Sequence, residues 1–444
     1  MKGRIDLMTT TKTLLLVACA GAFPAFPSFG APVASFIPSA HTGTAIQQAI
    51  DAASAAGGGR VVLEKAVYPS GTIYLKSRVE LHVPEGATIL GNDTPDGYDD
   101  VDDPRIGVVP ELSAKAFIAC LDAEDVSITG SGVIDGQGLR FYDTKTTKGR
   151  FFRKPPHPRP RMVEFFNCRN VRFEDVTFKD SPGWTCWIRK CQNFTAERVK
   201  IHGDQRMINN DGFHVDCCQH VRIRNCDIRT GDDCVIMRAI RPQDGAFDAC
   251  EDMVVEDCSL DSACQCIRLT CPSDGTIRNG TFRNLKMRGY NGVVSGHPVQ
   301  YLRKGDSGSC LMQNILVENC DIDVRNGAIL FNVEPGIILR EFGNVTFRNV
   351  NLKSVLPLQF QGTGDTVLRN IRLENVTGTV AAEQPFDMKC VENITFEHFN
   401  VTSGSGKKSP SPAIGNLIFA ANRPCEKAVA PRMIACQGHQ GAFR

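Results

Sequence analysis

The chain has 444 residues, of which 42% are hydrophobic and 22% charged, and its formal net charge is +1. This composition excludes a wholly disordered chain. The near-zero net charge excludes the overall basic field that is typical of nucleic-acid-binding proteins, so we expect no nucleic-acid partner. After the N-terminal segment, no stretch reaches about 18 consecutive apolar residues, so we expect no membrane span.

The N-terminal segment has the pattern of an export signal. Lys2, Arg4 and Lys12 precede the apolar run Leu14–Ala20, and small residues follow near Ala31. A charged start, a short apolar middle and a small-residue cleavage site are typical of a secretory signal peptide. We therefore expect residues 1–30 to be a signal peptide and the mature protein to be secreted or periplasmic.

The 19 cysteines do not form a zinc-binding pattern. Cys217 directly precedes Cys218, and Cys264 and Cys266 are only two residues apart, which is too close for paired CxxC knuckles. Most cysteines occupy repeated positions and are interpreted as small apolar core residues. Export permits disulfides, and Cys425 with Cys436 is a candidate pair. We expect no metal site.

An internal repeat dominates the rest of the chain. Each unit begins with a run such as Asn170-Val-Arg-Phe-Glu-Asp-Val, in which apolar and polar residues alternate with the period of a strand. An Asn or Asp then turns the chain, because these residues tolerate left-handed backbone. Further copies begin at His220, Asp252, Asn314, Asn344, Asn370 and Asn393.

Such short strands bury their apolar face only by stacking on neighbouring repeats. We therefore predict an all-β, single-stranded right-handed parallel β-helix as the catalytic domain, over residues 31–402. A β-sandwich would need more frequent hairpin turns, and helical repeats conflict with the period of two. We expect a monomer.

Both ends of the predicted β-helix need covering. The run Thr44-Ala-Ile-Gln47 indicates a capping box that opens a helix over Ala45–Ala56, and this helix is expected to cap the N-terminal end. Residues 403–444 lose the repeat and are expected to form an irregular tail packed on the β-helix. Two insertions, Asp143–Arg161 and Asn291–Ser309, are either binding-face loops or plain solvated loops.

Three aspartates occur on neighbouring repeats. Asp211 lies in Asn209-Asn-Asp-Gly, and Asp232 and Asp233 lie in Gly231-Asp-Asp. The spacing 232 − 211 = 21 is close to one coil, so the carboxyl groups should lie on adjacent rungs and raise at least one pKa. Hydrolysis of a glycosidic bond needs one protonated and one ionised carboxyl group. A calcium site or simple turn formation is the alternative interpretation.

The chain resembles glycoside hydrolase family 28, the pectin-degrading polygalacturonases and rhamnogalacturonases. The resemblance rests on Asn209-Asn-Asp-Gly and Gly231-Asp-Asp-Cys, and more weakly on Gly57–Leu63, Leu81–Gly91 and Ile128–Gly138. It implies an inverting hydrolase without cofactors, acting on an acidic polysaccharide or oligosaccharide related to galacturonan or rhamnogalacturonan. It implies that Asp232 is the general acid and that Asp211 and Asp233 activate water.

Two motifs of that family are missing. Gln265 or a neighbour stands where the family has the His of Gly-His-Gly, and Asn291–Gly296 occupies the region of its Arg-Ile-Lys. Arg238 or Arg268 could bind a uronate carboxylate in compensation, or each could be a solvated arginine. The predicted substrate-binding residues are therefore Asn209, His214, Arg238, Gln265 and Arg268.

Two other function classes remain open at this point. A β-helix polysaccharide lyase or uronate epimerase would use calcium or an arginine to neutralise the uronate and a Lys or Arg as base. A non-catalytic carbohydrate-binding solenoid would tolerate the missing motifs but has no need of three crowded carboxylates. Trp184 and Trp187 are either a sugar-stacking platform or core residues.

Overall fold

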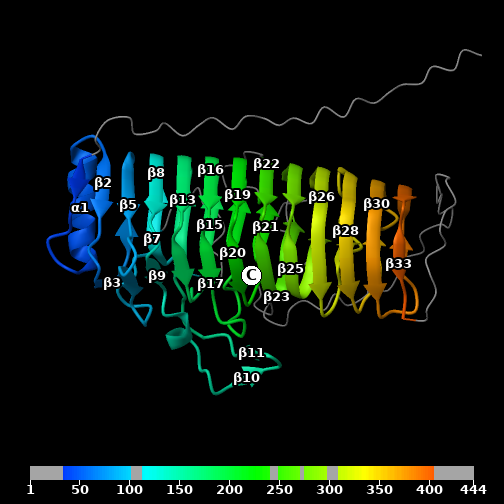
Figure 1. Ribbon diagram of the computed structural model, residues 1–444, viewed down its shortest axis with the longest axis horizontal. Helices are drawn as coiled ribbons and strands as arrows, with labels where there is room; N and C mark the ends of the chain where they lie inside the picture. Colours follow the sequence, from blue (N-terminus) through cyan, green and yellow to red (C-terminus); the bar gives the residue numbers. More distant parts are fainter. Residues whose placement is uncertain (1–33, 102–112, 241–248, 271–274, 298–308, 405–444) are drawn as a thin grey trace, which may run out of the picture.

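The computed structural model describes residues 34–101, 113–240, 249–270, 275–297 and 309–404. The predicted signal peptide, the Cys425–Cys436 pair and almost all of the predicted tail lie outside these ranges. Within them the chain forms one long coil of strands that runs along the longest axis of the molecule (Figure 1). No helix within the described ranges is long and apolar enough to cross a membrane.

The helical elements are α1 (Gly43–Ala55) and the short 3-10 helix η2 (Gly138–Phe141). The strands of the N-terminal half are β1 (Ser35–Phe36), β2 (Gly59–Val62), β3 (Val67–Ser70), β4 (Ile73–Tyr74), β5 (Val79–His82), β6 (Thr88–Gly91), β7 (Ala116–Leu121), β8 (Glu124–Thr129), β9 (Val133–Asp135), β10 (Thr147–Lys148), β11 (Phe151–Phe152), β12 (Arg161–Phe166), β13 (Arg169–Glu174), β14 (Thr177–Lys179), β15 (Cys186–Arg189), β16 (Gln192–Glu197) and β17 (Lys200–His202). The remaining strands are β18 (Phe213–Asp216), β19 (Gln219–Arg224), β20 (Asp227–Thr230), β21 (Val235–Arg238), β22 (Ala249–Glu256), β23 (Ser259–Thr270), β24 (Thr276–Arg283), β25 (Lys286–His297), β26 (Leu311–Val324), β27 (Ile329–Val333), β28 (Glu341–Ser354), β29 (Leu358–Gln361), β30 (Leu368–Val380), β31 (Phe386–Lys389), β32 (Val391–Glu397) and β33 (Asn400–Thr402).

These strands pair in parallel from one coil to the next, in three stacks that enclose the core. The stack that matters most here runs β7–β12–β15–β18–β21–β23–β25–β27–β29–β31 and is called the site stack. The only antiparallel strand pair within the described ranges is the small hairpin β10–β11, which projects from the side of the coil (Figure 1). The predicted right-handed parallel β-helix is confirmed.

The core follows from the period-two pattern. In β13, Val171 and Phe173 are buried, whereas the alternate residues Arg172 and Glu174 are partly exposed. The same inward rows continue from coil to coil, so that Phe173 stacks edge-on against Phe194 at 5.2 Å between ring centroids. Within the described ranges thirteen free cysteines are buried, as expected for small apolar core residues, among them Cys226, Cys258 and Cys320.

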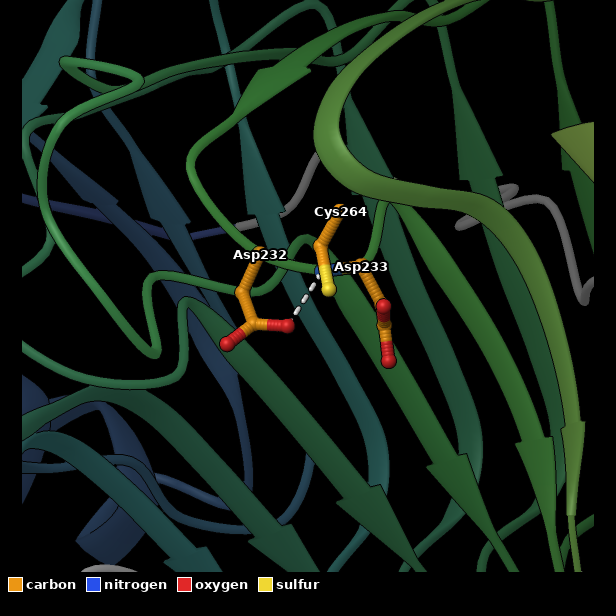
Figure 2. Close-up of side chains that lie close together, drawn as sticks. All are labelled: Asp232, Asp233 and Cys264. Atoms are coloured by element: carbon orange, nitrogen blue, oxygen red, sulfur yellow. Dashed lines mark hydrogen bonds between the residues drawn. The ribbon is translucent and has the colours of Figure 1, made fainter. Parts of the chain in front are cut away.

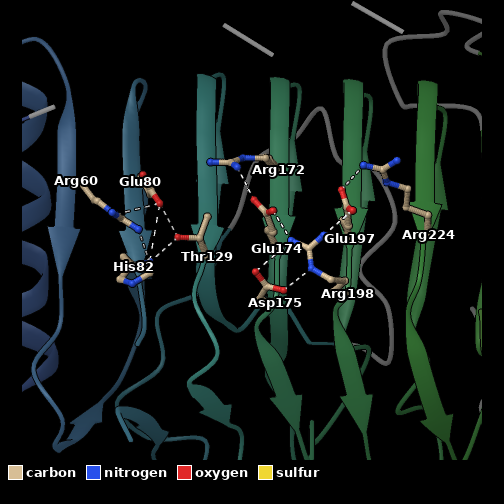
Figure 3. A network of polar contacts seen from close by, with 10 residues as sticks. All are labelled: Arg60, Glu80, His82, Thr129, Arg172, Glu174, Asp175, Glu197, Arg198 and Arg224. Carbon is tan, nitrogen blue, oxygen red and sulfur yellow. Dashed lines mark hydrogen bonds and ion pairs between the residues drawn. The ribbon is translucent and has the colours of Figure 1, made fainter. Parts of the chain in front are cut away.

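The outward rows carry charge. Arg198 bridges Glu174 at 2.5 Å and Asp175 at 2.6 Å, and neighbouring rungs add further ion pairs (Figure 3). Nearer the N-terminus, Glu80 accepts a hydrogen bond from Thr129 and forms an ion pair with Arg60. Exposed pairs of this kind are each worth only about 0–1 kcal/mol, so the apolar interior carries most of the stability.

The turns use asparagine as predicted. The predicted turn residues Asn319, Asn349 and Asn375 have φ values between 52° and 54°, in the left-handed region, and Asn170 and Asn193, which open their repeats, have φ values of 56° and 57°. Their side chains also bond to one another across coils; for example, the Asn193 amide donates to Asn170 at 2.9 Å. Asparagine therefore both turns the chain and links the rungs.

Helix α1 packs against β1–β5 at the N-terminal end and buries Ile46, Ala49, Ile50 and Ala53, as predicted. Its predicted capping box is wrong. The N-cap is Thr42, whose hydroxyl accepts from the backbone N–H of Ala45. Gln47 bonds instead to both backbone groups of Tyr74 in β4, so tertiary contacts use the side chain that the sequence pattern assigned to the cap.

Candidate active site

The three predicted aspartates meet at the site stack. Phe213 of β18 pairs with Val235 of β21, and the N–H of Gly212 donates to the carbonyl of Asp233 at 2.8 Å. Asp211 therefore lies one rung from Asp233, at the usual parallel-strand spacing of roughly 4.8 Å. The predicted juxtaposition on adjacent coils is confirmed, with Asp233 as the direct neighbour of Asp211.

All three side chains are buried: Asp211 is 4% exposed, Asp232 5% and Asp233 0%. Burial together with the charges of Asp232 and Asp233 raises the pKa of Asp211 well above its ordinary value. One oxygen of the Asp211 carboxyl, Oδ1, has no hydrogen-bond partner among the described residues. A buried carboxyl group that favours its proton thus lies beside two further carboxyl groups.

Asp232 is held by the backbone and by Asn209. Its Oδ2 accepts from the N–H of Asn209 at 3.2 Å and from the Asn209 amide at 3.4 Å. Its Oδ1 accepts from the N–H of Asp233 at 3.1 Å, which is the dashed contact in Figure 2. Asn209 itself has φ 59°, a left-handed conformation that asparagine tolerates well. The predicted substrate-binding residue Asn209 therefore holds a candidate catalytic side chain.

Sequence reasoning missed the residue that anchors Asn209. Arg159 is almost fully buried and donates from Nη2 to Oδ1 of Asn209 at 3.0 Å. Its other amino group, Nη1, donates to the carbonyl oxygens of Pro182 at 3.1 Å and Ile208 at 2.8 Å. The insertion 143–161 thus contributes a structural link to Asp232, although only its net basic character was visible in the sequence.

Arg268 faces Asp233. Its Nη1 donates to Oδ2 of Asp233 at 3.1 Å, and its charge also counteracts the raised pKa of Asp211. Arg268 pairs in register with Ile236 and Val294 on the site stack. The arginine that was predicted to bind a substrate carboxylate is therefore bonded to a candidate catalytic carboxylate.

Arg238 lies deeper in the fold than predicted. It is 8% exposed, donates to Asp216 at 3.0 Å and lies over the Trp184 ring at 5.0 Å. A guanidinium that already has a buried carboxylate partner is poorly placed to bind a substrate carboxylate as well. Sequence reasoning did not single out Asp216. Burial on its own would raise the pKa of its carboxyl group, but the charges of Arg238 and Arg189 outweigh burial, so the pKa is lowered.

His214 and the tryptophans form one buried cluster. The His214 ring stacks on Trp184 at 3.7 Å between centroids, and its Nδ1 lies 3.5 Å from the Asp211 carboxylate. Trp184 is 8% exposed and Trp187 is fully buried. The core-packing interpretation of the tryptophans is therefore the better one, and His214 lies between Trp184 and the Asp211 carboxylate.

Gln265 continues the row of Asp211 and Asp233. The N–H of Cys234 donates to its carbonyl at 2.9 Å, and Gln265 pairs in register with Asn291 of β25. Its side-chain oxygen is buried and has no hydrogen-bond partner among the described residues. Gln265 thus offers an unused acceptor one rung beyond the aspartates.

Asp232, Asp233 and Cys264 each have a potential ligand atom, and these atoms lie within 4.8 Å of one another (Figure 2). Cys264 is disulfide-bonded, however, as is Cys390. A disulfide sulfur is not the thiolate that binds a metal ion. The donor set is thereby reduced to two carboxylates, one of which already bonds to Arg268, so these residues fit a metal centre poorly.

Comparison with known proteins finds similar enzymes. Residues 106–243, which include all three aspartates, match the model of "Glycosyl hydrolases family 28". The chain is similar to the family 28 glycosyl hydrolases over this region. It is 25% identical over 346 residues to a polygalacturonase of Gossypium barbadense, an alignment that covers 73% of this chain and 70% of the relative. The resemblance predicted from the sequence motifs is confirmed, and the enzyme class it indicates is glycoside hydrolase.

Solved structures agree on the fold. The exopolygalacturonase from Thermotoga maritima superposes with a TM-score of 0.65 at 22% identity, covering 85% of this chain and 93% of that one. The polygalacturonase from Erwinia carotovora gives a TM-score of 0.59 at 19% identity and covers 83% and 100%. The parallel β-helix is therefore shared with these two polygalacturonases.

Proposed function

We propose that this protein is an inverting glycoside hydrolase that cleaves glycosidic bonds in a pectin-type acidic polysaccharide or its oligosaccharides, related to galacturonan or rhamnogalacturonan. The observation that carries the proposal is the buried group Asp211, Asp232 and Asp233 on two successive coils, within the matched family region. Three adjacent carboxyl groups can hold a proton and a charge at the same time, and glycoside hydrolysis needs both.

Asp233 is suited to remain a carboxylate. The ion pair with Arg268, 3.1 Å long, stabilises its charged form at a buried position. A carboxylate in this position can accept a proton from an attacking water molecule. Asp211, one rung away, is the second group that would hold this water.

Asp232 is proposed as the general acid that protonates the leaving oxygen, as the family resemblance implies. Among these groups the raised pKa belongs to Asp211, because burial and the charges of Asp232 and Asp233 disfavour its carboxylate form. Carboxyl groups this close titrate as one cluster, so the proton that the cluster retains is available to Asp232 when the leaving oxygen approaches. The N–H donors of Asn209 and Asp233 then stabilise Asp232 as it becomes negative.

We also propose that the protein acts outside the cytoplasm. The disulfide-bonded Cys264 and Cys390 support an oxidising compartment, and the N-terminal sequence has the signal-peptide pattern. An extracellular polysaccharide is the substrate class that fits this location.

The test is product analysis on a panel of pectic oligosaccharides, rhamnogalacturonan fragments included. The proposal expects new reducing ends and, by NMR at early times, a product whose anomeric configuration is inverted. An unsaturated, ultraviolet-absorbing product would assign the protein to the lyases instead. Binding of the saccharides without any cleavage would support a non-catalytic carbohydrate-binding solenoid.

A further inference from the structure

Arg150 reaches the active site from the β10–β11 hairpin. Its Nη2 donates a hydrogen bond to the backbone carbonyl of Ala263 in β23. Ala263 directly precedes Cys264, whose sulfur lies within 4.8 Å of carboxylate oxygens of Asp232 and Asp233. The hairpin therefore places a guanidinium beside the aspartates, 113 residues along the chain from the strand that it contacts.

Two aromatic rings fix the plane of this guanidinium. Its central carbon lies 4.7 Å from the ring centroid of Phe151 and 4.3 Å from that of Tyr290. Stacking on aromatic faces orients an arginine without using its N–H groups. Because only one amino group is bonded to Ala263, the other N–H donors of Arg150 keep the forked arrangement that binds a carboxylate with two hydrogen bonds.

A second arginine lies on the next coil. Both the backbone N–H and Nε of Arg325 donate to the carbonyl of Gly289, at 3.0 and 3.2 Å, and the N–H of Asn326 donates to the carbonyl of Tyr290 at 2.9 Å. Arg325 is thus tied to the segment on which Arg150 stacks. Partial burial and the positive charge of Arg325 both lower the pKa of Arg150.

These two arginines differ from Arg238 and Arg268 in their partners. Arg238 bonds to Asp216, and Arg268 bonds to Asp233. Among the described residues, no carboxylate forms an ion pair with Arg150 or Arg325. Two neighbouring cations that have no ion pair with a carboxylate of the described residues form a site that an added anion would stabilise. The segment Asn291–Gly296, which follows Tyr290 on the site stack, contains no cation of its own.

We propose that Arg150, supported by Arg325, is the specificity-determining residue that binds the carboxylate of a uronate unit next to the cleaved bond. The inference rests on the proposed glycoside hydrolase function and adds the substrate class, a uronate on the side of Asp232 that faces β23 and β25. The cation that recognises the acidic sugar thus comes from an inserted hairpin and not from a coil of the β-helix.

The test compares Arg150→Gln with the wild type on oligogalacturonate and on its methyl ester, in which the carboxylate charge is removed. We expect kcat/KM on the free acid to fall about 10- to 100-fold, the range for lost hydrogen bonds to a charged group, and at least tenfold more than on the ester. Arg150→Lys, which keeps the charge but not the fork, should lie between the two enzymes on the free acid.

Arg206→Gln is the matched control. Arg206 stacks on the next aromatic residue, Phe152, at 4.6 Å, but it is exposed and paired with Asp204. This control should leave the preference for the free acid unchanged. Equal losses on acid and ester in Arg150→Gln would overturn the proposal, because they would indicate a merely structural role.

A separate measurement distinguishes failure of this inference from failure of the proposed function. If the wild type cleaves neither substrate, the hydrolase proposal fails, and calorimetric binding of trigalacturonate to the full chain still tests Arg150. Weaker binding by Arg150→Gln than by Arg206→Gln would support the carboxylate site. Equal affinities in the two variants would overturn it.

Discussion

The burial of Asp211 in the candidate active site lowers the stability of the folded protein. The Asp211 carboxyl group is buried, and the charges of Asp232 and Asp233 raise its pKa further. A group whose folded pKa is raised binds its proton more tightly in the folded than in the unfolded state. Stability therefore falls as the pH rises from the ordinary aspartate pKa to the raised value, and it stays lowered above that.

Asp211→Asn should accordingly stabilise the protein at pH 7, by at least about 1 kcal/mol, while removing activity. At pH 3, where Asp211 is protonated in both states, the stabilisation should largely disappear. Thermal unfolding of the variant and the wild type at both pH values measures this difference. Asp227→Asn, which changes an exposed carboxylate of β20 that bonds to His202, is the control. An Asp211→Asn variant that is no more stable than the wild type at pH 7 would contradict the assigned cost.

Arg268 is expected to act through Asp233. In Arg268→Gln the carboxyl cluster loses its cation and holds protons up to higher pH, since Arg268 opposes the raised pKa of Asp211. The acidic limb of the kcat/KM profile should move to higher pH, and activity at the wild-type optimum should fall about 10- to 100-fold.

Arg268→Lys should shift the acidic limb of the kcat/KM profile much less than Arg268→Gln does, because lysine retains the positive charge. The pH profiles of the three enzymes on one pectic oligosaccharide provide the measurement. A uniform loss at every pH, with both limbs unmoved, would mean that Arg268 does not control the ionisation of the cluster.

At the residue scale, the sequence could predict which aspartates meet, because the repeat length fixes which residues stack. It could not predict their partners. In the sequence, Arg238 and Arg268 are both arginines near the end of a strand, and only the structure shows that Arg238 bonds to Asp216, its partner in register, whereas Arg268 bonds to Asp233. Arg159 and Arg150 lie in an insertion without repeat pattern, so their contacts depend on tertiary structure alone.

At the scale of the element, asparagine does two things that are separable by substitution. Asn349 has φ 52°; its amide donates to Asn319 at 2.9 Å and its oxygen accepts from Asn375 at 2.7 Å. The first property requires a residue that tolerates left-handed backbone. The second requires a side chain with both a donor and an acceptor.

Asn349→Gly should cost about 1–2 kcal/mol, because it loses only the two hydrogen bonds. Asn349→Ala should cost about 1 kcal/mol more, since alanine is strained in the left-handed region and glycine is not. Urea unfolding of both variants gives the comparison. Equal costs for alanine and glycine would show that backbone conformation is not what selects asparagine at this turn.

The capping helix shows why element boundaries were harder to predict than the elements themselves. The buried stripe of α1 was predictable from its apolar spacing, whereas the cap was not. Thr42 and Thr44 are both suitable N-cap residues, and Gln47 made Thr44 the better match to a capping box. The bonds between Gln47 and Tyr74 of β4 form only once the helix is docked on the first coils.

At the scale of the whole molecule, the regular spacing of the coils places functional groups of successive coils one strand apart. Asp211, Asp233, Gln265 and Asn291 follow one another along the site stack as successive coils are added. The sequence repeat alone could predict this regular stacking, because stacked strands with period-two patterning allow few other folds. The insertion 143–161 brings Arg150 and Arg159 to this row of residues.

The central claim is that this arrangement hydrolyses a glycosidic bond through its aspartates, and Asp232→Asn tests it most directly. Cleavage of a pectic oligosaccharide by the wild type, by Asp232→Asn and by the control Asp227→Asn should be compared by the rate of reducing-end formation. We predict a loss of at least about 10³-fold in Asp232→Asn, with unchanged folding and retained saccharide binding, and wild-type rates in the control. Undiminished cleavage by a folded Asp232→Asn variant would contradict the account.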